Sequence, residues 1–303
     1  MKTNTLVKLY YNVSDNYAGG DAAGAEFAEA DPTADDLVRV NYLAGDIKIK
    51  AKSFKRVRLK APGDGLGKGR VVTVGAEFPE LEFSYYLQTA ADPFKVIAVG
   101  GTEGTSGTSH LFQIVIPDPS EAAATLVYNI YGAQLTSYSI NSKVDNDKPP
   151  VVTVKFACYS MVINAGIAQT ATIPAGIINE WDDIVVTLDA DVIAELEEFT
   201  LTITLKYSTS KSGRNGTFAK FKPNLLDTLF EYSVKMYKDA AALMRDKITE
   251  ALNSFTVIWT EGTNTITVTN CYSDADNFGD FAGDDITDVL NEITIKNGAS
   301  AFS

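Results

Sequence analysis

The residues of this chain that could do acid–base or nucleophilic chemistry are few, and His110 is the first to consider. It is the only histidine in the sequence, so a Ser-His-Asp or Cys-His mechanism would have to depend on it. It opens the apolar run HLFQIV, directly after a stretch rich in Gly, Thr and Ser. That position, at the start of an expected strand, is typical of a structural histidine. The acidic residues are scattered, so the sequence predicts no catalytic residue and no enzyme.

A glycine-rich segment at 61–70, APGDGLGKGR, invites comparison with a phosphate-binding loop. A Walker loop needs four residues between Gly and Gly-Lys, followed by Ser or Thr, but here Lys68 precedes Gly69 and position 62 is proline. Strands and not a helix are expected next, which excludes the dinucleotide fingerprint as well. We interpret this segment as a flexible hairpin tip. The segment STSKSGRNG at 208–216 is likewise rich in small residues and contains basic ones.

An acidic segment at 274–285, DADNFGDFAGDD, has some of the spacing of a calcium loop. Asp274 and Asp276 stand near EF-hand positions, but Phe278 falls where an oxygen ligand belongs and Asp285 replaces the bidentate glutamate. No helix pair is expected on its two sides, and no His/Cys cluster elsewhere has metal-ligand spacing. The sequence therefore predicts a solvated acidic loop, with no metal site and no cofactor.

Composition limits the classes of protein to which the chain can belong. Its 303 residues suffice for two domains of ordinary size, and 45% hydrophobic with 21% charged residues is typical of globular proteins. No apolar run approaches the roughly 18 residues that span a bilayer, and the N-terminus lacks the apolar core of a signal peptide. A net charge of −13 disfavours nucleic-acid binding. Two lone cysteines, Cys158 and Cys271, favour reduced thiols.

One run, 47–60, is strongly basic although the chain as a whole is acidic. A groove for single-stranded nucleic acid would need interleaved aromatic residues, and only Phe54 is present. Two interpretations remain. The run is an edge strand whose lysines discourage pairing with other chains, or it is a basic face that docks against an acidic face of an identical neighbour. The residues that we expect at such a subunit contact are Lys48, Lys50, Lys52, Lys55, Arg56 and Arg58.

Strand patterns dominate the rest of the chain. Apolar residues alternate with Thr in FTLTITLKY around Leu201, and β-branched runs recur through both halves. One helix is expected between Asp239, a possible N-cap, and Asn253, because the apolar residues between them recur with helical period. Its counterpart is the shorter PFKVIAV at 93–99. The segment 164–182 breaks the pattern and is the expected linker.

The two halves of the chain follow the same order of segments. Phe83 pairs with Tyr232, Phe112 with Phe255, Leu126 with Ile266 and Val154 with Ile293 in the alignment that we favour. A repeat this long indicates a duplicated domain, although a shared β-rich pattern without common descent remains an alternative. We expect a mainly β chain with a first domain at 1–163, of which 1–45 is an N-terminal extension, a linker at 164–182, and a second domain at 183–303. Each domain is expected to be an antiparallel sandwich or barrel with a flanking helix.

The stretch from His110 to Cys158 resembles the tail tube proteins of long-tailed phages. The similarity lies in the His-x-Phe strand, the Tyr131-Gly132 turn, the Ser-rich strand that follows, and a final β-branched strand at 151–157. The second half, from about Phe199 to Asn297, is similar in the order of its elements. The chain departs from single-domain members of that family in its length and in its 1–45 segment.

The resemblance implies a structural virion protein whose rings stack into a conduit for genome ejection, assembled in the host cytoplasm. Two tube domains per chain would give a homotrimeric ring with pseudo-sixfold symmetry; the alternative is a homohexamer. Expected partners are further copies of the chain and the tape measure, tail terminator and tail tip proteins, with DNA passing through unbound. A type VI secretion-like tube protein and a β-rich ligand-binding or adhesin module are the alternative functions.

The resemblance also implies that a long hairpin loop of each domain reaches the adjacent ring. The residues expected there are Gly63, Gly65, Gly67, Lys68 and Gly69 in the first half and Lys211, Gly213, Arg214, Asn215 and Gly216 in the second. Because acidic residues outnumber basic ones by 39 to 26, we expect a mostly negative channel.

Overall fold

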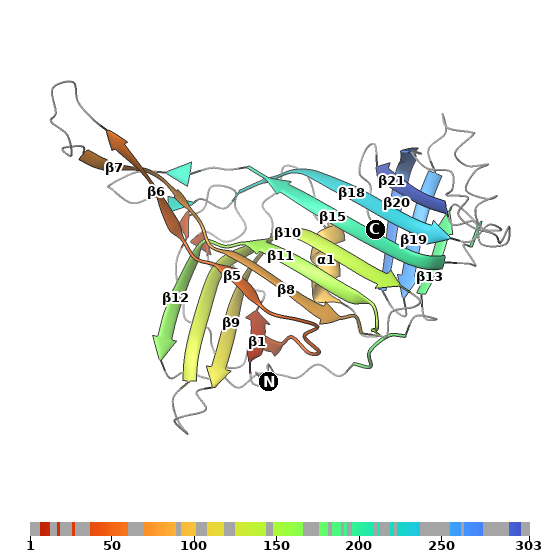
Figure 1. Cartoon of the computed structure of the whole chain (residues 1–303), viewed down its shortest axis with the longest axis horizontal. Coiled ribbons are helices and arrows are strands. Elements are labelled where there is room, and N and C mark those ends of the chain that lie inside the picture. Colours follow the sequence, from red (N-terminus) through yellow and green to blue (C-terminus); the bar gives the residue numbers. More distant parts are fainter. Residues whose placement is uncertain are drawn as a thin grey trace, which may run out of the picture.

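The computed structural model of the chain shows a mainly β protein with one α-helix among the residues that it describes (Figure 1). The helix is α1 (Pro93–Gly100). The described residues are 7–12, 17–18, 26–27, 37–59, 70–88, 92–100, 108–117, 125–143, 148–165, 176–180, 184–188, 191–192, 196–208, 211–212, 219–220, 223–236, 255–261, 264–274 and 291–297.

The first half contributes the strands β1 to β12. Most of them join one 15-stranded antiparallel sheet, and the pairs β2–β3 and β6–β7 stand apart from it. The bounds are β1 (Lys8–Asn12), β2 (Tyr17–Ala18), β3 (Glu26–Phe27), β4 (Val38–Arg39), β5 (Lys48–Lys50), β6 (Ser53–Leu59), β7 (Arg70–Glu77), β8 (Glu80–Tyr86), β9 (Ser109–Pro117), β10 (Thr125–Lys143), β11 (Val151–Ala157) and β12 (Ser160–Ala165).

The second half contributes the strands β13 to β21. It continues the same sheet, because β15 pairs with β10 of the first half. The bounds are β13 (Ile184–Leu188), β14 (Asp191–Val192), β15 (Leu196–Tyr207), β16 (Lys211–Ser212), β17 (Ala219–Lys220), β18 (Leu225–Met236), β19 (Phe255–Glu261), β20 (Asn264–Asp274) and β21 (Asn291–Asn297).

The long strand β10 connects two layers of the first half. Its N-terminal part pairs with β9 and β12, whereas its C-terminal part pairs with β11 and β15. A β-bulge between Ile130 and Ala133 lies at the change, and Gly132 there has φ 59°, which glycine adopts without steric cost. The layers meet through aromatic rings: Phe112 on β9 lies 5.6 Å from Phe83 on β8, centroid to centroid. Side chains of β8 and β9 therefore pack against each other in the core of the first half.

The strand order of the first half occurs again in the second. The described pairings run β4, β1, β9, β10, β11, β8, β5 in one half and β14, β13, β19, β20, β21, β18, β15 in the other. The order along the chain is also the same. In each half a separate two-stranded hairpin is inserted between the third and fourth of these strands along the sequence. It is β6–β7 between β5 and β8, and β16–β17 between β15 and β18.

Details of register repeat as well. The bulge of β10 has a counterpart in β20, between Val268, which pairs with Val257, and Cys271, which pairs with Phe255. Asn270 in this bulge has φ 55°, close to the φ 59° of Gly132. Glycine and asparagine are the residues that tolerate this left-handed conformation best. The two halves therefore share their strand order and a left-handed residue at the corresponding bulge.

The observed register changes part of the alignment favoured from sequence. Val154 and Ile293 do occupy equivalent positions, but Phe83 is equivalent to Val234, two residues from Tyr232, once pairing across β8–β11 and β18–β21 is compared. Phe112 is equivalent to Val257 and Leu126 to Asn264, each again two residues from the partner expected from sequence. A displacement of two keeps every side chain on its face, so the hydrophobic pattern does not reveal it.

Residues of the expected N-terminal extension and of the expected linker contact the sheet. Within the expected N-terminal extension, β1 and β4 pair into the sheet, because Leu9 and Tyr10 are apolar and become buried against β9. Within the expected linker, the backbone N–H of Asn179 donates to the carbonyl of Leu87 at 3.0 Å. The expected helix at 239–253 lies outside the described residues.

Candidate functional site: a polar sheet face and the junction behind it

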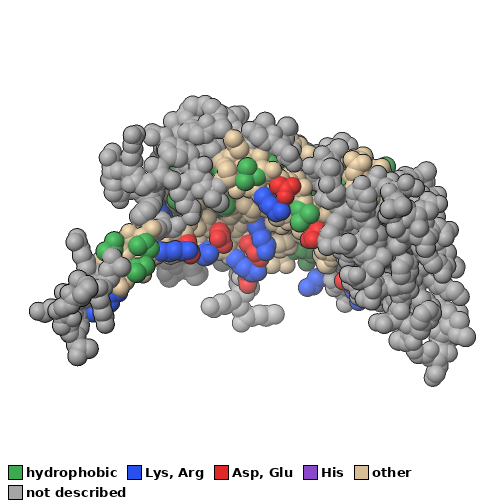
Figure 2. Space-filling view, turned by 90° about the horizontal axis from the view of Figure 1, so that it is seen from above, with side chains coloured by type: hydrophobic (Ala, Val, Ile, Leu, Met, Phe, Trp, Pro, Cys, Tyr) green, Lys and Arg blue, Asp and Glu red, His purple; other side chains and the backbone are tan. Residues whose placement is uncertain are grey.

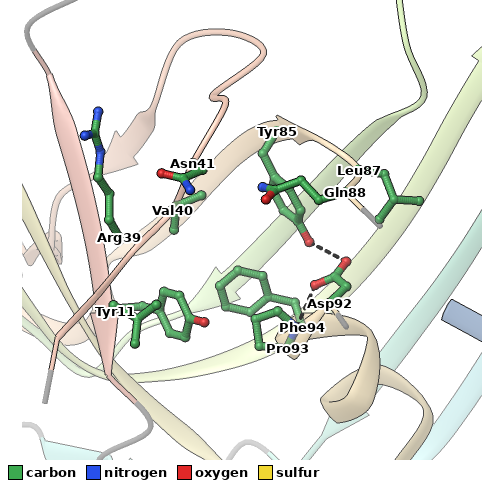
Figure 3. Close-up of a pocket in the computed structure, with 11 residues that line it drawn as sticks. Tyr11, Arg39, Val40, Asn41, Tyr85, Leu87, Gln88, Asp92, Pro93 and Phe94 are labelled. Atoms are coloured by element: carbon green, nitrogen blue, oxygen red, sulfur yellow. Dashed lines mark hydrogen bonds between the residues drawn. The ribbon is translucent and has the colours of Figure 1, made fainter. Parts of the chain in front are cut away.

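The junction between the halves is built around Asp92, which is buried. Asp92 precedes Pro93 and accepts a hydrogen bond from the backbone N–H of Phe94 at 2.9 Å, so it is the N-cap of α1. Its other carboxylate oxygen accepts hydrogen bonds of 2.8 Å from the hydroxyls of Tyr85 and Tyr138. One side chain thus connects α1 to β8 and β10 (Figure 3).

Asn264, at the start of β20, connects this centre to the second half. Its carbonyl oxygen accepts from the backbone N–H of Asp92 at 2.9 Å, and its amide donates to the carbonyl of Gln88 at 3.2 Å. The Asn264 side chain is fully buried. Lys95 of α1 adds a third contact, because its ammonium donates to the carbonyl of Thr265 at 3.1 Å. The helix of the first half is therefore held by the second half.

The small pocket beside Asp92 has little capacity for a ligand or for catalysis. Its volume of about 150 Å³ is below the range of ordinary ligand sites, roughly 300–1,000 Å³, and rings such as Tyr11 and Phe94 line it (Figure 3). Burial raises the pKa of Asp92 even though its hydrogen bonds oppose the shift. Burial, followed by the charge of Asp92, raises the pKa of Tyr11 to about 12. The carboxylate is used in capping and in two tyrosine hydrogen bonds, which is a structural role.

His110 lies in the core, as the sequence predicts for a structural histidine. It is fully buried and its ring centroid lies 5.7 Å from that of Phe156 and 6.0 Å from those of Phe94 and Phe112. Burial lowers its pKa to about 4. His110 is therefore a neutral aromatic-like residue at neutral pH.

Helix α1 lies on one side of the sheet (Figure 1), and the outward side chains on the other side are mostly polar across both halves. This surface extends over β5, β8, β11, β10, β15 and β18, which are neighbours in that order. Buried apolar and outward polar residues alternate along each strand. On β15, for example, Leu201 and Ile203 are fully buried whereas the Thr residues that alternate with them are half-buried. Hydroxyl pairs join neighbouring strands, such as Ser84 with Thr153 at 2.8 Å. We call these outward side chains the polar face.

Charges on the polar face occur in pairs of opposite sign. Glu82 lies 2.7 Å from the ammonium of Lys48 and 3.3 Å from that of Lys155. The hydrogen bond from Lys48, which is the larger effect, lowers the pKa of Glu82. The remaining pairs of the described face are Lys50 with Glu80, Lys143 with Glu198, and Lys206 with Asp227. In Figure 2 the Lys and Arg side chains accordingly lie interspersed with Asp and Glu.

The basic run divides between two elements. Lys48 and Lys50 are exposed on β5, the edge strand of the sheet order, with Ile49 half-buried between them. Lys55, Arg56 and Arg58 lie on β6. The ammonium of Lys55 lies 3.1 Å from a carboxylate oxygen of Glu77 in the same chain. The remaining residue, Lys52, lies over the rings of Phe54 and Phe78, 5.7 and 5.3 Å from their centroids.

The hairpin β6–β7 projects from the body of the molecule as an arm (Figure 1). It exposes apolar as well as basic side chains: Phe54, Val57, Val71 and Val74 are each between 43% and 59% exposed. A two-stranded hairpin is at best marginally stable alone in water. An arm with this much apolar surface needs another surface to cover it.

Several expected site residues lie outside the described part of the chain. These are Gly63, Gly65, Gly67, Lys68 and Gly69 in the segment between β6 and β7, and Gly213, Arg214, Asn215 and Gly216 in the second half. Of the second set, Lys211 lies in β16. The acidic segment after Asp274 is also undescribed, and within the described residues no cluster of His, Cys, Asp or Glu could hold a metal ion. Cys158 and Cys271 are free and buried.

Sequence reasoning did not find Asp92, Asn264 or the paired charges of Glu82. The residues Asp92-Pro93 before an apolar run do carry a helix-start signal, which could have indicated the cap. Nothing in the sequence places Asn264 next to Asp92, since that contact depends on how the halves dock.

The sequence matches no protein-family model and no curated protein. In the part of the chain that the structure describes, no helix has both the length and the apolar character needed to cross a membrane.

Proposed function

We propose that this chain is a structural subunit of a phage tail tube, three copies of which form a ring with pseudo-sixfold symmetry. The observation that carries the proposal is the repeated strand order, β4 to β5 and again β14 to β15, joined edge to edge through β10 and β15. One chain thus contains two equivalent units related by a head-to-tail contact. Heterologous contacts of this kind close into rings when the rotation between units permits it.

The arm β6–β7 supports stacking of the rings. Its exposed apolar residues, Phe54 and Val71 among them, suit contact with a neighbouring ring better than exposure to solvent. The hairpin β16–β17 stands at the equivalent place in the second half. Each chain therefore offers two arms, one from each unit.

We further propose that the polar face is the wall of the channel. A wall that lets DNA pass must not offer free cations to phosphate, since each Lys–phosphate contact adds to salt-dependent binding. On the described face Lys48, Lys50 and Lys155 already have carboxylate partners. Because these lysines lie beside carboxylates, a channel built from this face would avoid DNA through these contacts of its cations and not through the negative excess expected from composition.

One other class of function receives less support, and a second shares the proposed architecture. A ligand-binding or adhesin module would need an exposed aromatic platform; Trp259 is fully buried, and Trp181 lies outside the described residues. A type VI secretion-like tube protein would share the ring architecture, and the present fold suits it equally.

Negative-stain microscopy of the purified chain, together with mass measurement of the particles, tests the proposal. We expect rings or rods in which each ring contains three chains. Rings of six chains would refute the trimer, and single compact particles at every concentration would refute the tube.

A shortened arm tests stacking separately. Leu59 and Arg70 pair at the end of the hairpin, so deletion of 62–69, with Lys60→Asn and Ala61→Gly, leaves a two-residue turn that suits it. The variant should remain soluble and form no long tubes, whereas a control deletion of 102–107, another loop rich in Gly, Ser and Thr, should still form them. Long tubes from the shortened arm would contradict its assignment.

A further inference from the structure

The two faces of the arm β6–β7 carry different side chains. In an antiparallel pair, directly opposite residues lie on one face, and alternate residues of a strand share a face. Arg58 is opposite Val71 and Arg56 is opposite Thr73. Phe54 precedes Arg56 by two residues and therefore lies on the same side of β6. We call this side of the arm, with Phe54, Arg56, Arg58, Val71 and Thr73, the basic face.

The opposite face of the arm contains Lys55 and Val57, with Val72 opposite Val57. The β-bulge of the hairpin adds its extra residue, Val74, to β7, so β6 keeps its alternation. The ammonium of Lys55 lies 3.1 Å from a carboxylate oxygen of Glu77. The lysine of this face is therefore paired within the arm.

The basic face combines exposed cations with exposed apolar side chains. Phe54 is 50% exposed and Val71 is 59% exposed. Arg56 and Arg58 are exposed as well. Figure 2 shows hydrophobic side chains of the arm beside Lys and Arg at the left of the view. Aromatic residues and arginine are among the types enriched at protein–protein interfaces, so the basic face has the composition of a protein-binding surface.

Charge indicates which protein would bind there. The described part of the arm, residues 53–59 and 70–77, has four basic residues and one acidic residue, a net charge of +3. The whole chain has −13, so the residues outside this part carry −16. An acidic chain repels nucleic acid, whereas its own acidic surfaces attract a basic arm. A second copy of the chain is therefore the partner that the charges fit.

We propose that the basic face of the arm docks on an acidic surface of a second copy of the chain, and that the opposite face stays outside this contact. The inference rests on the proposed function, in which the arm joins successive rings, and it specifies the face that binds and the chemistry of its partner. Of the basic run expected at a subunit contact, Lys48, Lys50 and Lys55 have carboxylate partners in their own chain. Arg56 and Arg58, which share the basic face, form the contact.

Charge reversal on the basic face tests the proposal. Arg56→Glu with Arg58→Glu should raise the protein concentration needed for tubes at least about tenfold in light scattering, because the reversed charges would meet acidic residues. Lys8→Glu with Lys148→Glu is the matched control, since it changes the net charge equally at two exposed lysines outside the arm. The control should change that concentration less than about twofold.

Two valines on opposite faces of the arm give a second comparison. Val71→Thr should weaken tube formation, whereas Val57→Thr, at a valine that is 43% exposed, should form tubes as the unmodified chain does. All four variants should keep the thermal unfolding midpoint of the unmodified chain, because the changed side chains are exposed. Equal effects of the two valine substitutions would overturn the assignment of the face.

The remaining outcomes separate this inference from the tube itself. Normal tubes from the arginine variant, or an equal loss from the control at Lys8 and Lys148, would overturn the docking face and leave the tube intact. Single particles of the unmodified chain at every concentration would overturn both. A mobility shift of a short DNA duplex by the unmodified chain, lost in the arginine variant, would assign the basic face to nucleic acid and overturn a second copy as its partner.

Discussion

Asn264 makes the most direct prediction about the junction between the halves. Asn264→Ala would leave the backbone N–H of Asp92 and the carbonyl of Gln88 without the partners that they have at 2.9 and 3.2 Å. The contact with Asp92 is buried, where water cannot simply replace the amide, and the contact with Gln88 is partly buried. The substitution therefore affects a junction at which two halves of the chain meet.

The magnitude follows from the cost of unsatisfied buried groups. Each buried donor or acceptor left without a partner costs about 1–3 kcal/mol. Asn264→Ala removes the partner of one buried group, at that full cost, and of one partly buried group, at the lower end of that cost, so the free energy of unfolding should fall by about 2–4 kcal/mol. This is a large part of the 5–15 kcal/mol that is typical of folded proteins.

Urea denaturation measured by intrinsic fluorescence and by far-UV circular dichroism would provide the assay. Asn141→Ala is a matched control: its amide donates to the Thr200 hydroxyl at 2.8 Å across the same junction, but the contact is exposed. The control should cost less than about 1 kcal/mol, since water can replace that bond. Equal losses from the two variants would refute the reasoning that burial makes Asn264 important.

Three further predictions concern single residues. Burial lowers the pKa of His110 to about 4, so the unfolded chain binds its proton more tightly, and folding stability should fall by about 3 kcal/mol as pH falls from 6.5 towards 4; His110→Phe should remove this part of the pH dependence in urea titrations, and an unchanged profile would contradict it. Gly132→Ala should destabilise the chain by about 1–2 kcal/mol at φ 59°, whereas Asn270→Gly should be close to neutral in thermal melts; equal effects would show that the bulges are not alike. Glu82→Gln releases Lys48 and Lys155 from their shared carboxylate, so assembled tubes should retain DNA at low salt and release it as salt rises; no retention would count against the polar face as the channel wall.

The sequence predicted strands well because one physical signal, alternation, determines them locally. Leu201 and Ile203 alternate with threonines in the sequence and are buried while the threonines face outward. The helix at 93–99 was recognised too, since α1 spans Pro93–Gly100. The common order of strands in the two halves could be predicted from the order of such segments, but the register between the halves could not. A shift of two residues between Phe83 and Val234 leaves each side chain on the same face, and the pattern is unchanged.

The candidate site was less accessible to sequence reasoning. Lys48 and Glu82 are far apart in the sequence, and their ion pair depends on the register of β5 against β8. The contact of Asn264 with Asp92 depends in addition on how the second half docks against α1. Such contacts are set by tertiary arrangement, so residue type and spacing carry no signal for them.

Strand β12 (Ser160–Ala165) makes the two units unequal. It covers the edge of β10 by pairing from Leu126 to Tyr131, and the described part of the second half has no strand at the equivalent edge of β20. In a ring of three chains, edges with and without this strand would alternate around the circumference. A partner protein with true sixfold symmetry would then meet two kinds of surface, whereas a threefold partner would meet one. Any cap or adaptor that recognises this edge is expected to have a matching threefold symmetry.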